Sequence, residues 1–206
     1  MGTPAIQVRS DWPSLCRSHR SPGRHLSDVT RSLAIGLGHF ADDPDRSMPT
    51  QMMDLGLILE WGFANMLLHE YPDMYYRDWD EERQCWRAGL EVEKDGIVGT
   101  LDLWKIGEKP MAVEDVKLTR KSSRHDQDGP KWWEAWTRLK GYCWMTGSRV
   151  GRLWIAHVFD YSGKFGGDVE RVCWERRFDS EEGEAELRGN WAMIVRHEKQ
   201  MRLEGK

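Results

Sequence analysis

Three short extended segments, set between long helical patterns, constrain the fold of this chain more than any other feature. They span roughly residues 84–92, 97–105 and 111–118. The first connection contains Asp95-Gly96, a strong signal for a tight hairpin, and the second contains Gly107 and Pro110. Because short connections join antiparallel neighbours, we expect the three segments to form an antiparallel meander.

Helical patterns precede and follow these segments. Apolar residues recur at helical spacing over residues 26–40, 51–70, 131–146 and 179–203. Ser27 is a suitable N-cap of the first helix, Gly147 ends the third, and Asp179 opens a capping-box-like sequence. Two further strands are expected over residues 152–161 and 170–178. This order predicts an α/β fold in which a central mixed sheet, begun by the antiparallel meander, is flanked by helices.

The composition suits one soluble domain. The chain has 206 residues, and its 39% apolar residues, with 12 Trp, supply a core. Residues 1–25, rich in Ser, Arg, Pro and Gly, are expected to form a flexible arm before a single domain over residues 26–206. No apolar run reaches the roughly 18–20 residues of a membrane span, and no secretory signal is present, so we expect a cytoplasmic protein without a membrane partner.

The four cysteines show no paired spacing. Cys16, Cys85, Cys143 and Cys173 lie far apart, without the C-x-x-C pair that a zinc site needs. We therefore expect buried or free thiols in a reducing cytosol.

The charge balance leaves a nucleic-acid partner open. The formal net charge is −4, whereas a protein that coats DNA is usually basic. An enzyme that binds a divalent cation needs clustered carboxylates, however, and only a local basic path for phosphates. Such a path is present in Lys117, Arg120, Lys121, Arg124 and Lys131.

The most informative stretch runs from Gly99 to Lys117. Residues alternate faces along a strand, so Asp115 and Lys117 point to the same side. Asp102 lies in the preceding strand, and hairpin pairing can bring its carboxylate close to Asp115. Two carboxylates and an ammonium group would then converge at one end of a sheet. The alternative, equally compatible with the spacing, is that both aspartates are surface or hairpin-end residues.

These groups match the needs of phosphodiester hydrolysis. Carboxylate oxygens bind Mg²⁺ or Mn²⁺, hard cations that prefer oxygen ligands, and the backbone carbonyl of Val116 is a further candidate ligand. The cation neutralises the scissile phosphate and lowers the pKa of a water molecule. Lys117 can orient or help deprotonate that water, and can stabilise negative charge in the transition state.

Glu60 is a candidate third acidic ligand. It lies in an otherwise apolar run of the second helical pattern, between Leu59 and Trp61. Burying a single carboxylate is costly unless it is paired or bound to a metal, so we favour a ligand role over a place on the solvated side of the helix. His69, at the end of the same pattern, is interpreted as a capping or surface residue.

In their order along the chain, these motifs resemble the RecB-like and lambda-exonuclease-like branch of the PD-(D/E)XK nuclease superfamily, especially its small phage-encoded members. The resemblance covers most of residues 26–200. The matching pieces are a G-x-x-x-E helix (Gly56, Glu60), a G-T-x-D strand (Gly99, Thr100, Asp102), a D-x-K strand (Asp115, Lys117), Thr119 with Ser122-Ser123, an aromatic helix with Tyr142, and a closing helix with Asn190-Trp191.

The resemblance implies a restriction-endonuclease-like core and a Mg²⁺- or Mn²⁺-dependent nuclease. Its substrate would be DNA ends or single-stranded DNA, in phage recombination or replication within the host cytoplasm. By matching position, Glu60, Asp102 and Asp115 would hold the metal and Lys117 would be catalytic. The clustered cysteines of iron–sulfur members are absent, so no such cluster is expected. Whether the protein forms an oligomer or has a recombination partner is left open.

The sequence departs from the family pattern at one position. RecB-type members carry Gln four residues before the helix tyrosine, whereas Arg138 precedes Tyr142 in this chain. Arg138 can contact a phosphate in bidentate fashion, and Tyr142 is either a DNA contact or a core aromatic.

Further DNA contacts are expected after the D-x-K strand. Arg120, Lys121 and Arg124 are interpreted as phosphate contacts, with a solvated loop as the alternative. Four tryptophans of the aromatic helix can stack on exposed bases, namely Trp132, Trp133, Trp136 and Trp144. Trp136 shares a helical face with Leu139 and Cys143, which favours a place in the core for Trp136. The leading hypothesis is an exonuclease. The alternatives are an inactive nuclease-fold module that binds DNA or a protein, and a structure-specific endonuclease.

Overall fold

A computed structural model describes residues 23–39, 50–76, 79–80, 85–86, 90–120, 130–159 and 165–205. The helices within these residues are α2 (Leu26–Gly36), α3 (Thr50–Glu70), α4 (Pro130–Thr146) and α5 (Glu181–Leu203). The strands are β1 (Arg24–His25), β2 (Trp79–Asp80), β3 (Cys85–Trp86), β4 (Leu90–Lys94), β5 (Ile97–Leu101), β6 (Leu103–Lys105), β7 (Ala112–Arg120), β8 (Val150–Phe159) and β9 (Phe165–Arg177). Most of the predicted N-terminal arm lies outside the described residues, but its last two residues form β1, which pairs with β5.

The strands described form three sheets, and the predicted α/β class is confirmed. The four-stranded sheet has the order β6-β7-β8-β9, the three-stranded sheet β1-β5-β4, and the small one β2-β3. Both larger sheets are mixed, because β7 runs parallel to β8 and β1 parallel to β5, while the other pairs are antiparallel. Residues 95 and 96 form the tight turn between β4 and β5 with φ values of 54° and 75°, as the Asp95-Gly96 pair predicts.

The predicted meander is wrong in one respect that shapes the rest of the molecule. The expected strand over residues 97–105 is broken at Asp102 into β5 and β6, which belong to different sheets. At the break, the Asp102 carboxylate accepts a hydrogen bond from the backbone N–H of Val116 in β7 at 2.8 Å. A side chain therefore takes the place of a backbone carbonyl of the sheet, and the two hairpins diverge from this point.

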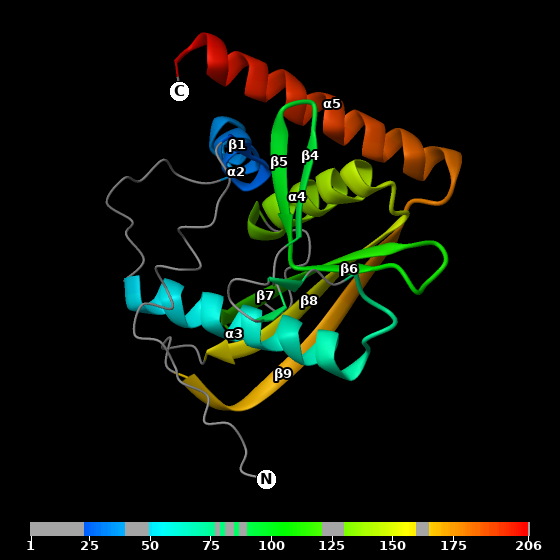
Figure 1. Ribbon diagram of the computed structural model, residues 1–206. Coiled ribbons are helices and arrows are strands. Elements are labelled where there is room, and N and C mark those ends of the chain that lie inside the picture. Colours follow the sequence, from blue (N-terminus) through cyan, green and yellow to red (C-terminus); the bar gives the residue numbers. More distant parts are fainter. Residues whose placement is uncertain are drawn as a thin grey trace.

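Helices cover both faces of the four-stranded sheet (Figure 1). Helix α3 packs on one face, where Ala64, Leu67 and Leu68 form a small core with Leu103 and Val116. Helix α4 packs on the other face against β7 and β8, and α2 and α5 pack on α4. The larger core lies on this side and includes Leu26, Val113, Trp132, Trp136, Leu139, Leu153, Ile155, Trp191 and Ile194.

The helix ends follow local signals in most cases. Ser180 is the N-cap of α5, and its Oγ accepts a hydrogen bond from the Gly183 N–H at 3.1 Å, as the capping-box-like sequence predicts. Gly147 follows α4 with a φ of 71°, the left-handed conformation expected of a helix-ending glycine. The predicted N-cap at Ser27 is wrong, because α2 already begins at Leu26 and His25 occupies the cap position.

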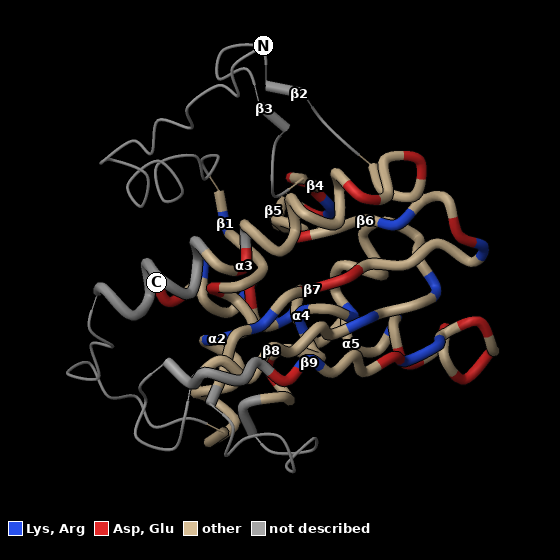
Figure 2. Tube along the Cα trace, turned by 90° about the horizontal axis from the view of Figure 1, so that it is seen from below, with Lys and Arg blue, Asp and Glu red and all other residues tan. Residues whose placement is uncertain are grey.

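Acidic and basic residues are interspersed along the described elements (Figure 2). Cys143 is a buried free thiol and Cys173 an exposed one, as expected for these two positions. Burial raises the pKa of Cys143 to about 12.

Among the helices described, none combines the length and apolar character needed to cross a membrane.

Candidate active site

One edge of β7 is open beyond Glu114, and two carboxylates occupy it. Strand β6 pairs with β7 only as far as Glu114, whereas β8 pairs with the other edge along the whole strand. On the open edge, the N–H of Val116 donates to Asp102 Oδ2 at 2.8 Å, and the N–H of Leu118 donates to Glu60 Oε1 at 3.3 Å. The break at Asp102 and the approach of α3 thus bring two of the predicted ligands to neighbouring points of β7.

The third predicted carboxylate lies beside them. Lys117 Nζ lies 2.8 Å from Asp115 Oδ2 and 4.0 Å from Asp102 Oδ2. It also donates a hydrogen bond to the carbonyl oxygen of Val116 at 2.8 Å. Asp115 is nearly buried, with 4% of its side chain exposed, whereas 31% of the Asp102 side chain is exposed. The structure therefore gathers Asp102, Asp115, Lys117 and the Val116 carbonyl as the sequence pattern indicates.

Arg138 supplies a second cation to the same carboxylate. Its Nη2 lies 3.5 Å from Asp115 Oδ2, and its Nη1 lies 3.9 Å from Glu134 Oε1 one turn earlier in α4. Asp115 Oδ2 and Arg138 Nε are both buried without a hydrogen-bond partner among the described residues. Asp115 Oδ2 is nevertheless in an ion pair, because Lys117 Nζ is so close to it.

The pKa shifts show how closely these charges interact. Burial, reinforced by the Asp115 charge and opposed by Lys117, raises the pKa of Asp102 to about 7. Burial likewise raises the pKa of Glu60, against the opposing effect of Lys117. Burial acts to raise the pKa of Asp115 as well, but Lys117 and Arg138 together hold it below its usual value.

Lys117 keeps its proton in this surrounding. Burial acts to lower the pKa of its ammonium group, but the charges of Asp115, Glu60 and Asp102 together outweigh that effect and the pKa is raised. At neutral pH the site therefore holds two cations, Lys117 and Arg138, facing three acidic groups.

Tyr142 packs beneath the site in the core. Only 4% of it is exposed, and a Cβ added at Gly99 would lie 2.9 Å from its Cε1 atom. The glycine of the G-T-x-D pattern thus leaves room for this ring between β5 and α4. Burial favours the core interpretation of Tyr142 over a direct DNA contact.

The other predicted DNA contacts have different outcomes. Lys121, Arg124 and the side chain of Arg120 lie outside the described residues. Trp132 and Trp136 are 1% and 5% exposed, so both belong to the core, as the helical face that Trp136 shares with Leu139 and Cys143 predicts for Trp136, and base stacking is excluded for these two. Trp133 and Trp144 are half-buried.

The donor set fits a hard divalent cation. It consists of three carboxylates and one backbone carbonyl, all oxygen donors of the type that Mg²⁺ and Mn²⁺ prefer. The buried Oδ2 of Asp115, which has no hydrogen bond from the described residues, is the kind of atom that a cation would satisfy. Within the part of the chain described, no three His, Cys, Asp or Glu side chains are already arranged around one point. In this structure Lys117 and Arg138 compensate the charge of Asp115 instead.

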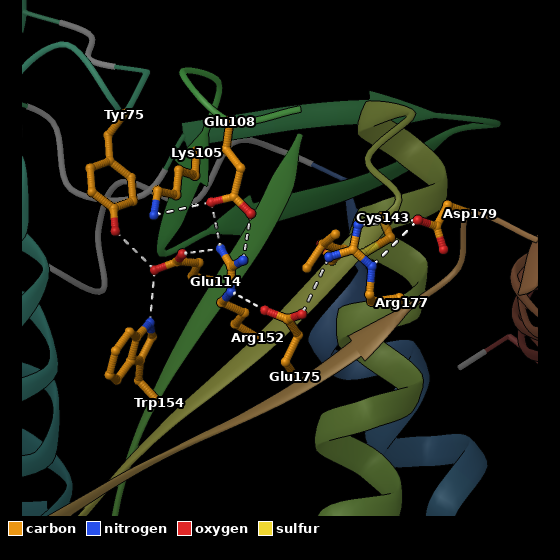
Figure 3. A network of polar contacts seen from close by, with 11 residues as sticks. Tyr75, Lys105, Glu108, Glu114, Cys143, Arg152, Trp154, Glu175, Arg177 and Asp179 are labelled. Atoms are coloured by element: carbon orange, nitrogen blue, oxygen red, sulfur yellow. Dashed lines mark hydrogen bonds and ion pairs between the residues drawn. The ribbon is translucent and has the colours of Figure 1, made fainter. Parts of the chain in front are cut away.

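A second acidic residue of β7 was missed by sequence reasoning. Glu114 is 1% exposed and points to the opposite face from Asp115, into a polar network (Figure 3). Its Oε2 accepts hydrogen bonds from Tyr75 at 3.0 Å and Trp154 at 2.7 Å, and its Oε1 pairs with Arg152 at 3.0 Å. The position of Glu114 within an apolar strand is a signal, but Tyr75 follows α3 whereas Arg152 and Trp154 lie in β8, and spacing alone does not connect these two segments with β7.

Arg152 extends this network across the sheet. It also pairs with Glu108, and its Nε lies 2.8 Å from Glu175 Oε2 in β9. All these charges are paired, so the Glu114 network holds β7, β8, β9 and the β6–β7 connection together rather than forming an open site.

Comparison with known proteins shows that the fold of this chain is similar to that of several solved structures. No protein-family model and no curated protein matches the sequence. Among solved structures, SSO0001 is similar with a TM-score of 0.50 and 14% identity, covering 94% of this chain and 83% of that one. At this identity the likeness concerns the fold alone.

Two exonucleases are also among the structural neighbours. The alkaline exonuclease LHK-Exo from Laribacter hongkongensis has a TM-score of 0.47 and 11% identity, covering 89% of this chain and 91% of that one. A phage-related exonuclease from Haemophilus somnus 129PT has a TM-score of 0.47 and 13% identity, with coverages of 87% and 83%. These neighbours share low identity with the chain.

Proposed function

We propose that this protein is a divalent-metal-dependent DNA nuclease that hydrolyses phosphodiester bonds. The observation that carries the proposal is the meeting of Asp102, Asp115 and Lys117 at the open edge of β7, with Glu60 beside them. A buried cluster of acids and a lysine in contact is costly to maintain for stability alone, because each charge loses its hydration. Strongly shifted pKa values in such a cluster are typical of functional sites.

The roles of the residues follow from their positions. Glu60, Asp102, Asp115 and the carbonyl of Val116 would hold Mg²⁺ or Mn²⁺. When bound, the cation supplies charge neutralisation of the scissile phosphate and activation of water. In the reaction, a water oxygen bonds to phosphorus while the P–O bond to the leaving sugar oxygen breaks, which yields a phosphate monoester and a hydroxyl group.

Lys117 acts as a fixed positive charge in this scheme. Its raised pKa keeps it protonated at neutral pH, so it is suited to stabilise negative charge on the phosphate oxygens rather than to accept a proton. Preorganised charges of this kind give some of the largest contributions to catalysis. The carbonyl of Val116 and the carboxylate of Asp115 hold the ammonium group in place.

The substrate is proposed to be DNA ends or single-stranded DNA, as the motif resemblance implies. Arg120 ends the strand that bears Asp115 and Lys117, and Lys121 and Arg124 follow it in the sequence; we expect these three residues to contact phosphates. Arg138 can reach a phosphate from the α4 side if it leaves Asp115, because its guanidinium already lies in the cluster.

Incubation of the purified protein with linear and covalently closed DNA tests the proposal. Mg²⁺, Mn²⁺ and EDTA are compared for each substrate. Degradation of linear DNA alone, dependent on the metal, is expected of an exonuclease, whereas cutting of closed circles indicates an endonuclease. Asp115→Asn should abolish the activity, and Asp179→Asn, which changes an exposed aspartate at the start of α5, should leave it intact.

A second candidate is a nuclease-fold module that binds DNA or a protein without cutting. The contact of Arg138 with Asp115 favours it, because a cation beside a ligand opposes metal binding. Calorimetric titration with Mn²⁺ separates the two candidates: the nuclease binds Mn²⁺ and loses it on Asp115→Asn, while the module binds DNA equally well with EDTA and cuts nothing.

A further inference from the structure

An open groove lies between the tip of the β4–β5 hairpin and helix α5, apart from the acidic cluster. Its volume is about 430 Å³. Trp144 from α4 and Trp191 and Val195 from α5 line it with apolar surface, and Arg188, Arg196 and Lys199 line it with positive charge. The mechanism proposed above uses none of these residues.

The regular spacing of α5 builds one wall of the groove. Arg188, Val195 and Lys199 recur at intervals of seven and four residues, so they lie along one side of the helix. The hairpin tip forms the facing wall, and it is fixed by a hydrogen bond of 2.8 Å from Trp191 Nε1 to Asp95 Oδ2. Among the described residues that line the groove, the single acidic side chain, that of Asp95, is therefore already engaged.

The cations of the groove are available to a ligand. Within the described part of the chain, no ion pair or hydrogen bond involves the side chain of Arg196 or Lys199. Arg188 is 66% exposed and has only a long contact of 3.5 Å with Glu184. Lys94 adds a fourth positive charge nearby, since its Nζ lies 5.2 Å from the centre of the Trp144 ring. In a chain with 34 acidic and 30 basic residues, this concentration of positive charge is local.

We propose that the groove binds a segment of single-stranded DNA, which rests on the proposed nuclease function and extends it to a second contact. Phosphates would pair with Arg188, Arg196 and Lys199, and a base or sugar would lie on the apolar surface at Trp144. Single-strand binding combines cations that follow the backbone with aromatic surface that accepts any base. An acidic peptide matches the cations, but it has no planar group for the tryptophan.

The hairpin connects the groove to the acidic cluster. Strand β5 runs directly from the tip at Asp95 and Gly96 to Asp102. At about 3.3 Å per residue, the two ends of this segment are roughly 20 Å apart. A strand held in the groove would thus be retained while another part of it is cut.

Binding of fluorescein-labelled oligothymidylate in EDTA tests this proposal without any cleavage. The double variant Arg196→Gln, Lys199→Gln should weaken binding about tenfold. It should also lower the slope of log affinity against log salt by about 1.4, since each single-strand phosphate contact contributes about 0.7. The matched control is Arg171→Gln, Arg177→Gln, which removes the same charge from exposed positions of β9 and should change neither quantity. Equal binding by wild type and the α5 double variant would overturn the proposal.

Photo-crosslinking locates the bound strand directly. Oligonucleotides with 5-iododeoxyuridine, irradiated with the full-length protein and mapped by mass spectrometry, should crosslink to the peptide that contains Trp144. Crosslinks confined to other parts of the chain would exclude the groove. Displacement of the oligonucleotide by polyglutamate at equal charge concentration would instead assign the groove to an acidic peptide, and would also overturn the proposal.

The outcomes separate this proposal from the proposed function. If the protein cuts no DNA but the α5 double variant still loses binding, the groove stands and the nuclease assignment fails. If DNA is cut in a metal-dependent way and the α5 double variant binds normally, only the groove proposal fails.

Discussion

The guanidinium of Arg138 lies 3.5 Å from the carboxylate of Asp115, across the interface between α4 and β7. Asp115 therefore faces two cations, because Lys117 contacts the same oxygen. Any divalent cation that binds this carboxylate must compete with both. The affinity of the proposed metal site is thus expected to depend on Lys117 and Arg138 as well as on the ligands themselves.

Replacing Arg138 with the neutral residue of the related motif, Arg138→Gln, should tighten Mn²⁺ binding. Removing one positive charge within about 5 Å of a divalent cation lowers the repulsion enough for an increase of about tenfold in affinity. Isothermal titration calorimetry measures the affinity for Mn²⁺ in the wild type and the variant. Lys140→Gln, which removes a cation of the same helix that pairs with Glu186, is the control and should leave the affinity unchanged. Weaker binding by Arg138→Gln would contradict the inference.

Lys117→Ala should reduce turnover on linear DNA by about 10²–10³-fold at saturating metal, because it removes a preorganised charge from the transition state. Circular dichroism verifies that the variant folds. Activity close to that of wild type in a folded Lys117→Ala protein would show that the lysine only compensates Asp115.

The stability of the metal-free protein should fall as the pH rises through the range in which Asp102 ionises. The folded-state pKa of Asp102 is raised from 3.8 to about 7, so between these values the folded protein holds a proton that the unfolded chain has lost. Folded protein that binds more protons loses stability with rising pH. Urea denaturation in EDTA at about pH 5 and about pH 7.5 measures this, and Asp102→Asn should reduce the difference. If the free energy of unfolding changes equally between the two pH values in wild type and in Asp102→Asn, the raised pKa of Asp102 is contradicted.

Gly99→Ala should destabilise the protein by about 1–3 kcal/mol, as overpacking of a core does. The new Cβ would lie 2.9 Å from Tyr142 Cε1 and 3.0 Å from Met145 Sδ, and both must move. Thermal denaturation measures the change. Gly189→Ala is the matched control, because a Cβ there meets nothing within 4 Å and alanine favours the helix. A Gly99→Ala protein as stable as wild type would mean that Tyr142 moves without cost.

Much of the secondary structure could be predicted because its signals are local. The turn at Asp95 and Gly96, the cap at Ser180 and the end of α4 at Gly147 each depend on the conformational preferences of one or two residues. The split between β5 and β6 could not be predicted in this way. It depends on the Asp102 side chain accepting a bond from Val116, fourteen residues later.

The composition of the acidic cluster was predictable only in part. Alternation along β7 places Asp115 and Lys117 on one face, and an acid in an apolar helix draws attention to Glu60. The contact of Arg138 with Asp115 depends on how α4 lies across the sheet, which the spacing of residues does not determine. For the same reason the sequence does not place Trp132 in the core, whereas the face that Trp136 shares with Leu139 and Cys143 does indicate a core place for Trp136.

Glu114 and Asp115 are adjacent in β7, yet their carboxylates lie on opposite faces of the sheet. A slip of the strand by one residue would exchange them, because side chains alternate with a period of two. Tyr75 after α3 and both Arg152 and Trp154 of β8 bind Glu114, and all three would lose their partner in such a slip. The buried polar network therefore fixes the register of β7. In doing so it determines that Asp115 lies on the face of the acidic cluster, although the network itself is on the opposite face of the sheet.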